Sequence, residues 1–218
     1  MRTRWTCAPL VFMAAFAVAC SRGPAAPSPA TAPLPSGRVA EPLSGTGSLG
    51  RRPDYHWPRD ESISDADLDA LWERQLMVPV EAQSRLTLRD DFSARRGDRI
   101  HGALDVLAPR YTAVLAADDC IIGRLVTGAV GGIVIYATDP QERFVYYYAH
   151  LQRYRRGLAV GDRVAKGSVI GYVGTSGNAP PDAPHLHFQV MKRAAGRVWW
   201  DGPYINPLPF FTSDGVRP

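Results

Sequence analysis

The residues best suited to chemistry stand in a short apolar run, residues 183–190, which contains His185 and His187. In an extended strand, residues i and i+2 point to the same face. The two imidazoles should therefore project side by side, while Leu186 and Phe188 point the other way, toward a core. Two imidazoles on one face are suited to binding a metal ion.

Other parts of the chain offer the remaining ligands of such a site. Asp105 follows His101 by four residues, and His150 stands in a second apolar run. Three nitrogen or oxygen ligands with one open position for water make the usual catalytic zinc site. His101, Asp105 and one member of the His185/His187 pair would complete it, with His150 beside the metal as an acid, a base or an oxyanion donor. A histidine taken alone is more often a core or surface residue, but these spacings fit one chemistry together.

Three motifs occur in order along the chain: His101-x-x-x-Asp105, Tyr148-Ala149-His150-Leu151 and His185-Leu186-His187-Phe188. Over roughly residues 86–210 the sequence resembles the lysostaphin-like, LytM-type zinc metallopeptidases, which cut peptide bonds in bacterial peptidoglycan. The resemblance implies that His101, Asp105 and His187 hold Zn²⁺. It also implies that His150 and His185 are the catalytic pair.

The resemblance further implies a mechanism and a substrate. His185 shares a strand face with His187 and would act as general base, whereas His150 would stabilise the oxyanion or donate a proton; the sequence leaves that division open. The substrate would be a cross-link or stem peptide bond of peptidoglycan. In a Gram-negative envelope, a bond between D-alanine and diaminopimelate is more plausible than a glycine bridge.

The first residues resemble an export signal. A basic start precedes an apolar run over residues 10–19, which is too short for a comfortable membrane span. Residues 17–20 resemble a bacterial lipobox, so we expect a lipoprotein signal peptide over residues 1–19 and a lipid on Cys20, with Ser21 favouring the outer membrane and a periplasmic position. The alternative is an ordinary signal cleaved nearby. Residues 20–53, rich in Pro, Ala, Ser and Gly, are expected to form a disordered tether.

Composition excludes some functions and structures. The net charge of the 218 residues is +4, and removal of Arg2 and Arg4 with the expected signal peptide would leave 4 − 2 = +2. This charge is too small to indicate a nucleic-acid partner, and no base-reading motif occurs. Apart from Cys7 and Cys20 in the targeting region, Cys120 is the only cysteine, so the folded part cannot form an internal disulfide. A zinc-ligand role for Cys120 is conceivable, but a small buried thiol fits its surroundings better.

The fold expected for the rest of the chain is all-β: an antiparallel sheet or sandwich of the LytM, duplicated hybrid motif type. A lead-in over residues 54–85 should contain a short helix over residues 64–76, capped by Ser64, with Asp67 at its third position. The metallopeptidase domain would span residues 86–211, followed by a tail over residues 212–218. Strands are expected over these ranges: 111–116, 120–126, 132–138, 144–150, 169–173, 185–191 and 198–204, with an extended segment over 207–211.

Two segments should border the substrate groove. The loop over residues 178–184 is expected to form one rim. The basic cluster of Arg95, Arg96 and Arg99 precedes His101; it is either a solvated loop or a contact for carboxylates of stem peptides.

Two other classes of function remain open. A LytM-type domain can be a non-catalytic regulator that activates cell-wall amidases, with an amidase or adaptor as partner, or a structural wall-binding lipoprotein. The presence of all five motif residues argues against both. Hydrolysis by the purified protein separates an enzyme from these two, and amidase stimulation separates a regulator from a structural binder.

Overall fold

The structure is a computed structural model that describes residues 52, 54–55, 58–196 and 198–216. The chain divides into two units, Met1–Gly45 and Thr46–Pro218, and all described residues belong to the second. The predicted signal peptide, Cys20 and all of the predicted tether except Arg52 therefore lie outside the described residues.

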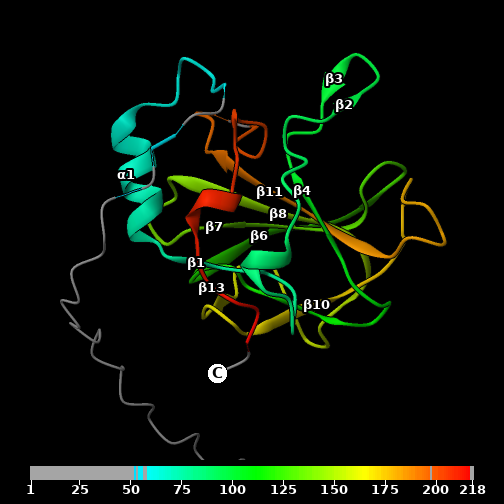
Figure 1. Cartoon of the computed structure of the whole chain (residues 1–218). Helices are drawn as coiled ribbons and strands as arrows, with labels where there is room; N and C mark the ends of the chain where they lie inside the picture. Colours follow the sequence, from blue (N-terminus) through cyan, green and yellow to red (C-terminus); the bar gives the residue numbers. More distant parts are fainter. Residues whose placement is uncertain (1–51, 53, 56–57, 197, 217–218) are drawn as a thin grey trace, which may run out of the picture. The chain divides into compact units, whose positions relative to one another are not determined.

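The described unit consists mainly of β-strands with one α-helix, which confirms the predicted fold class (Figure 1). The helix α1 spans Asp65–Glu73, and two 3₁₀ helices span Arg85–Thr87 (η1) and Leu208–Phe210 (η2). The strands are β1 (Leu76–Met77), β2 (Arg95–Arg96), β3 (Arg99–Ile100), β4 (Leu104–Leu107), β5 (Ala113–Leu115), β6 (Cys120–Gly128), β7 (Gly132–Thr138), β8 (Phe144–Tyr154), β9 (Arg163–Val164), β10 (Val169–Val173), β11 (His185–Lys192), β12 (Tyr204–Ile205) and β13 (Phe211–Ser213).

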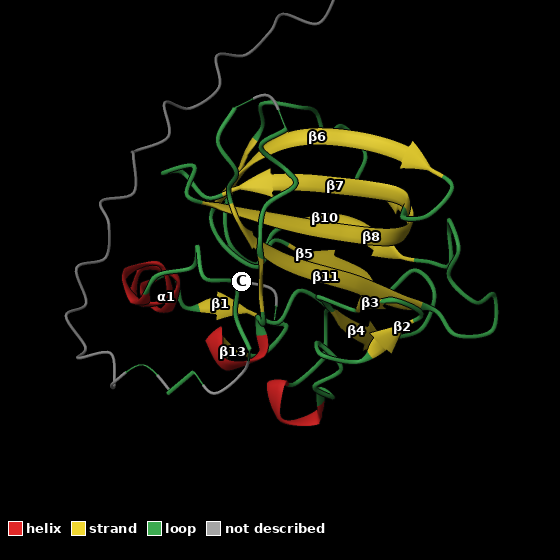
Figure 2. Cartoon of the chain, turned by 90° about the horizontal axis from the view of Figure 1, so that it is seen from above, coloured by secondary structure: helices red, strands yellow, loops and turns green. Residues whose placement is uncertain are grey.

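The long strand β8 is the centre of a nine-stranded sheet in the order β12-β11-β8-β7-β6-β9 (Figure 2). The first part of β8 pairs with β11, its last part pairs with β10, and its other edge pairs with β7. β4 adds to β11, and β5 adds to β10. All these pairs are antiparallel, as predicted; the short β1–β13 pair is parallel.

Most predicted strands coincide with observed ones, and three segments differ. β8 continues past His150 to Tyr154 instead of ending at the histidine. Of the predicted strand over residues 198–204, only the end belongs to a strand, Tyr204–Ile205. The segment expected to be extended over residues 207–211 contains η2, whose first turn holds a proline. Proline suits the first turn of a helix because its missing N–H has no partner there.

The helix α1 begins where the sequence predicts it, with the predicted capping box, but it ends at Glu73, and Leu76 belongs to β1. The Ser64 side chain accepts a hydrogen bond from the Asp67 N–H, and the Asp67 carboxylate accepts one from the Ser64 N–H. Leu68 and Leu71 are fully buried in the same core as the sheet residues. The lead-in is therefore packed on the sheet.

One end of β11 is tied to this helix. Lys192, the last residue of β11, forms an ion pair of 3.0 Å with Asp67 and donates a hydrogen bond of 2.6 Å to the Ser62 carbonyl. Between this anchor and the opposite end, Leu186, Phe188 and Val190 are fully buried. The strand that carries His185 and His187 is therefore held along its core face and at its end.

Within the described residues, no helix has the length and apolar character needed to cross a membrane.

Candidate metal and catalytic site

The pairing of β4 with β11 brings together two of the three predicted metal ligands. Asp105 lies directly opposite His187 in this antiparallel pair, and side chains at such positions meet on one face of the sheet. His187 Nδ1 lies 3.0 Å from Asp105 Oδ1. Two residues that are distant in the sequence thus become neighbours through strand register.

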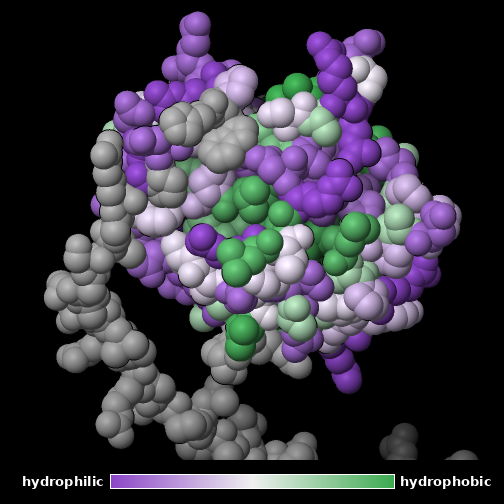
Figure 3. Space-filling view, in the orientation of Figure 1, coloured by the Kyte–Doolittle hydropathy of each residue, from purple (hydrophilic) through white to green (hydrophobic). Residues whose placement is uncertain are grey.

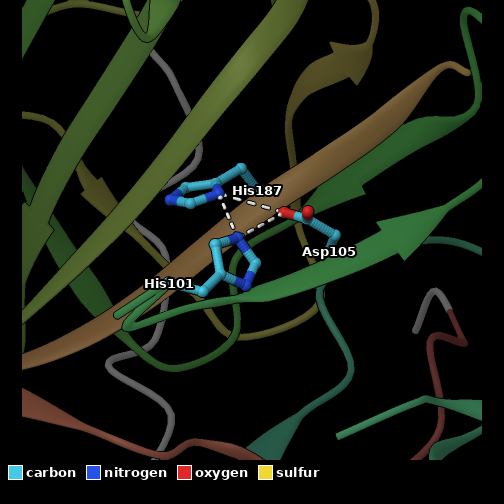
Figure 4. Close-up of side chains that lie close together, drawn as sticks. All are labelled: His101, Asp105 and His187. Carbon is cyan, nitrogen blue, oxygen red and sulfur yellow. Dashed lines mark hydrogen bonds and ion pairs between the residues drawn. The ribbon is translucent and has the colours of Figure 1, made fainter. Parts of the chain in front are cut away.

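His101 completes the group from the turn before β4 (Figure 4). Its Nε2 lies 3.1 Å from Asp105 Oδ1 and 3.1 Å from His187 Nδ1. Figure 4 shows the three side chains pointing toward one another from the turn, β4 and β11. A tetrahedral zinc about 2.0 Å from each ligand atom would separate those atoms by about 3.3 Å. The donor types and their spacing therefore fit Zn²⁺.

The backbone around His101 fixes which ring nitrogen faces the group. His101 Nδ1 lies 3.1 Å from the Asp91 carbonyl oxygen, and a carbonyl only accepts, so Nδ1 carries the hydrogen and Nε2 offers its lone pair. The His101 N–H donates to the Ala94 carbonyl at 2.8 Å, and the Gly102 N–H donates to the Phe92 carbonyl at 2.9 Å. These bonds fasten the turn to the segment before β2.

The charges of the metal-free group are strongly coupled. Burial by itself lowers the pKa of His101, but hydrogen bonds and charges from Asp105 and Asp91 raise it to about 9. Burial opposes ionisation of Asp105, yet hydrogen bonds from His101 and His187 hold its pKa far below the usual range. Burial lowers the pKa of His187. The Asp105 carboxylate is thus already in the form that binds metal, whereas His101 must lose a proton and His187 must release the Nδ1 hydrogen that it donates to Asp105.

The two predicted catalytic histidines stand beside these three residues. The ring centres of His150 and His185 are 5.0 Å apart, and those of His150 and His187 are 5.6 Å apart. His185 Nε2 lies 3.8 Å from Asp105 Oδ1. The structure therefore brings all five residues singled out from the sequence into one cluster.

Backbone carbonyls also set the tautomers of this pair. His185 Nδ1 donates to the Ala183 carbonyl at 2.8 Å, and His150 Nδ1 donates to the Ser176 carbonyl at 2.9 Å. Both residues thus keep the lone pair of Nε2 available to accept a proton. Burial, reinforced by the neighbouring His187 and His185, lowers the pKa of His150 to about 4, so its resting form is neutral.

His150 reaches the cluster through a break in strand alternation. Tyr148 pairs with Phe188 and is fully buried, and regular alternation would place His150 on the same core face. Instead, His150 has a left-handed φ of 59°. Ile135 of β7 pairs with Tyr148 of β8, and Ile133 pairs with Leu151. Between these two pairs, β8 therefore contains one residue more than β7. This extra residue is a β-bulge, which redirects the His150 side chain to the face of His187.

The cluster lies in a groove of about 1370 Å³. One side carries arginines of the β2–β3 hairpin, and the loop from Asn178 to Ala183 borders the groove, as predicted. Further along are aromatic residues that the sequence analysis did not single out: Tyr136, Tyr147, Trp200 and Tyr204. Counting along the sequence would not have found Tyr147, because it shares the face of His187 only through the register of β8 on β11.

The helix α1 and strand β1 do not line the groove in the described structure. Among the described residues, none before Gln83 lines the groove. The helix α1 and β1 therefore support the sheet without covering the cluster.

Two further polar contacts of the site were not predicted. The Arg96 guanidinium forms an ion pair of 2.8 Å with Asp105 Oδ2. Asp91 contacts His101 through its carbonyl and, at 3.6 Å, through its carboxylate. The sequence does not indicate either contact, because the two residues of each pair lie on different segments and no helix or strand repeat brings them together.

Cys120 plays no part in the cluster. The residue is a free cysteine with 2% of its surface exposed, and burial raises the pKa of its thiol to about 12. This confirms the interpretation as a small buried thiol.

Comparison with known proteins identifies relatives of the region that carries the cluster. Residues 99–207 match the profile of Peptidase family M23. An L-Ala–D-Glu endopeptidase of Bacillus subtilis is 31% identical over 133 residues, covering 55% of this chain and 40% of that protein. The glycyl-glycine endopeptidase ALE-1 of Staphylococcus capitis is 38% identical over 119 residues, covering 53% of this chain and 30% of that protein. This chain thus spans less than half the length of these curated relatives.

A solved structure has the same fold. It is a crystal structure from Ruminococcus gnavus, described as a glycyl-glycine endopeptidase lytM, with a TM-score of 0.55 and 23% sequence identity. The match covers 70% of this chain and 67% of that chain.

Proposed function

This chain belongs to peptidase family M23, and from that membership we propose that it is a zinc-dependent metalloendopeptidase of bacterial peptidoglycan. It hydrolyses cross-link or stem peptide bonds in the course of cell-wall remodelling. The observation that supports this most is the convergence of His101, Asp105, His187, His150 and His185 in one open groove. A groove leaves room for an extended peptide to lie across the cluster.

In this proposal the metal is held by His101 Nε2, Asp105 Oδ1 and His187 Nδ1. A bound zinc supplies a Lewis acid for the peptide carbonyl and lowers the pKa of a coordinated water from about 16 to roughly 7. Asp105 keeps one oxygen for the metal because Arg96 holds the other. The Asp91 carbonyl keeps the His101 ring oriented.

His185 is proposed as the general base. Its Nδ1 hydrogen is bound to the Ala183 carbonyl, so Nε2 is the atom that takes the proton of the attacking water. The same nitrogen lies 3.8 Å from Asp105 Oδ1, so it faces the proposed metal ligands. The hydrogen bond to Ala183 also prevents the ring from turning its N–H toward the water.

His150 is proposed to stabilise the oxyanion or to return a proton to the leaving amine. Because its resting form is neutral, it can donate only after it has gained a proton during the reaction. Its ring is close enough to His185 for the two to share the protons of one cycle. The bulge in β8 keeps it at this position.

The proposed location is the bacterial cell envelope. It rests on the sequence of residues 1–21, which predicts export and a lipid on Cys20. In this proposal the lipid holds the protein in the outer membrane, facing the periplasm, where peptidoglycan is in reach. An amidase or an adaptor is a further proposed partner.

The test combines metal content and cleavage in one preparation. Purified protein is assayed for zinc by atomic spectroscopy and incubated with cross-linked muropeptides, with His185→Ala as the matched variant. We expect about one zinc per chain, cleavage by the natural protein and loss of cleavage in the variant. Product masses identify the bond. Zinc without cleavage of any muropeptide would contradict the proposal, and stimulation of a cell-wall amidase by that sample would identify a regulator instead.

A further inference from the structure

The β2–β3 hairpin brings arginines into the groove beside the five clustered residues of the candidate site. Arg96 and Arg99 are joined by a two-residue turn that starts with Gly97, whose φ is 65°, as suits the first central position of a tight hairpin turn. Arg95, Arg96 and Arg99 all line the groove. Figure 3 has the orientation of Figure 1, and the part that projects where Figure 1 shows the hairpin is mainly purple, which marks hydrophilic residues.

The register of the hairpin sets two guanidinium groups on one face. Arg96 and Arg99 are direct cross-strand partners, so their side chains leave the hairpin on the same side. Arg96 bonds Asp105 Oδ2 on that side. Arg99 is therefore directed toward the same side as Asp105. It lies beside Arg96, whose positive charge is already paired with the Asp105 carboxylate.

Two arginines of the hairpin lack a counter-charge in the described structure. Neither Arg95 nor Arg99 forms an ion pair with any described residue, and Asp98 of the turn pairs with neither of them. Like charges directly opposite each other destabilise a hairpin, so an anion near Arg99 would stabilise this arrangement. The acidic residues that line the groove are Asp91, Asp105 and Asp201, and the first two contact His101.

We propose that Arg99 binds a free carboxylate of the substrate peptide next to the scissile bond. This inference rests on the proposed function and narrows it to a substrate class. Guanidinium groups bind carboxylates through paired, charge-assisted hydrogen bonds. The preferred substrate is then a stem or cross-link peptide that carries ionised carboxyl groups, and a glycine bridge, which has no side-chain carboxylate, is a poor one.

The test compares two muropeptides that differ only in charge: one with free side-chain carboxyl groups, and the same one with those groups converted to carboxamides. Cleavage is measured with zinc-loaded protein. Binding is measured by calorimetry in a His150→Asn background, which prevents turnover while asparagine tolerates the left-handed backbone. Arg99→Gln is the test variant. Arg156→Gln is its matched control, because Arg156 is exposed and does not line the groove.

We expect the natural protein and the Arg156→Gln control to cleave and bind the acidic peptide about tenfold better than the amidated one, as for a charged hydrogen bond. Arg99→Gln should lose this preference by weakening only the acidic peptide. Equal use of the two peptides by the natural protein, or an undiminished preference in Arg99→Gln, would overturn the inference. Preferential binding without cleavage would support this carboxylate contact while contradicting the proposed enzymatic function.

Discussion

At the scale of single residues, hydrogen bonds to backbone carbonyls determine what each imidazole can do. His101, His150 and His185 each donate Nδ1–H to a main-chain oxygen, so Nε2 is the ring nitrogen left for other partners. His187 differs, because its Nδ1 faces Asp105. The chemistry of the cluster therefore depends on main-chain positions as much as on the side chains themselves.

The raised pKa of His101 predicts a pH dependence for the metal-free protein. The pKa is about 9 in the folded protein and 6.5 in an unfolded chain. Protonated His101 therefore stabilises the fold fully below pH 6.5, and this contribution is lost as the pH rises through about 9. Urea unfolding with a chelator present, at pH values across this window, should show a falling free energy of unfolding.

The control for this titration is His101→Gln, which removes the titrating group. The variant should lack the decline that the natural protein shows over the same window. Identical pH profiles for the two proteins would mean that His101 is not bound to Asp105 and Asp91 as the structure has it.

The left-handed backbone of His150 predicts an unusual ranking of two variants. Glycine in a strand is normally less stable than alanine, but at a φ of 59° alanine carries a steric penalty that glycine lacks. His150→Gly should therefore be more stable than His150→Ala by roughly 1 kcal/mol. Both variants should retain zinc, because His150 is not among the three proposed ligands.

Chemical denaturation and metal analysis of the two variants check this prediction. An alanine variant as stable as the glycine variant would show that residue 150 has ordinary strand geometry in solution. Such geometry would direct the side chain to the core, and the catalytic assignment of His150 would have to be given up.

At the scale of elements, the site depends on how a short turn joins β4. Gly102 lies in this turn with a φ of 66°, and an added Cβ would come within 2.8 Å of the Tyr204 ring. Because Gly102 is next to His101, a shift of the turn that relieves this contact would displace a proposed metal ligand. The position thus links β12 to the metal site.

Substituting this glycine tests the link. Gly102→Ala should weaken zinc affinity by about tenfold, the lower end of what disturbed ligand orientation costs. Gly97→Ala is a matched control, because Gly97 has a similar φ of 65° but nothing lies within 4 Å of its added Cβ. Competition with a fluorescent zinc chelator measures both. Equal affinities for the two variants would show that the contact with Tyr204 does not position His101.

At the scale of the whole described unit, the metal would join segments that are far apart in the chain. His101 and Asp105 lie before and on β4, whereas His187 lies on β11, more than 80 residues later. A ligand that binds only the folded state stabilises it by mass action, by about 2.7 kcal/mol when its free concentration is 100 times its Kd. Zinc should therefore stabilise the folded state by holding β4 and β11 together.

Metal removal tests this stabilisation. The melting temperature of zinc-loaded protein should fall when a chelator is added, and it should recover when zinc is restored. His187→Ala is the control, because a protein that lacks one ligand should melt at nearly the same temperature with and without the chelator. A natural protein whose melting is insensitive to the chelator would contradict a metal that bridges the two strands.

The sequence by itself determined the parts of the site that depend on local periodicity. A strand alternates with a period of two, so the spacing of His185 and His187 placed both on one face and left Leu186 and Phe188 for the core. The same local logic gave the capping box of α1, because its two hydrogen bonds join residues three apart. The order of the motifs indicated the family that the profile match then showed.

Only the tertiary structure decided how these pieces meet. The register of β4 on β11 sets Asp105 opposite His187, and a bulge that depends on pairing with β7 turns His150 away from the core face that alternation predicts. The contact of Arg96 with Asp105 arises in the same way, from where a hairpin lies relative to a strand. Strand register and bulges are fixed by partners distant in the chain, so no spacing along the sequence reveals them.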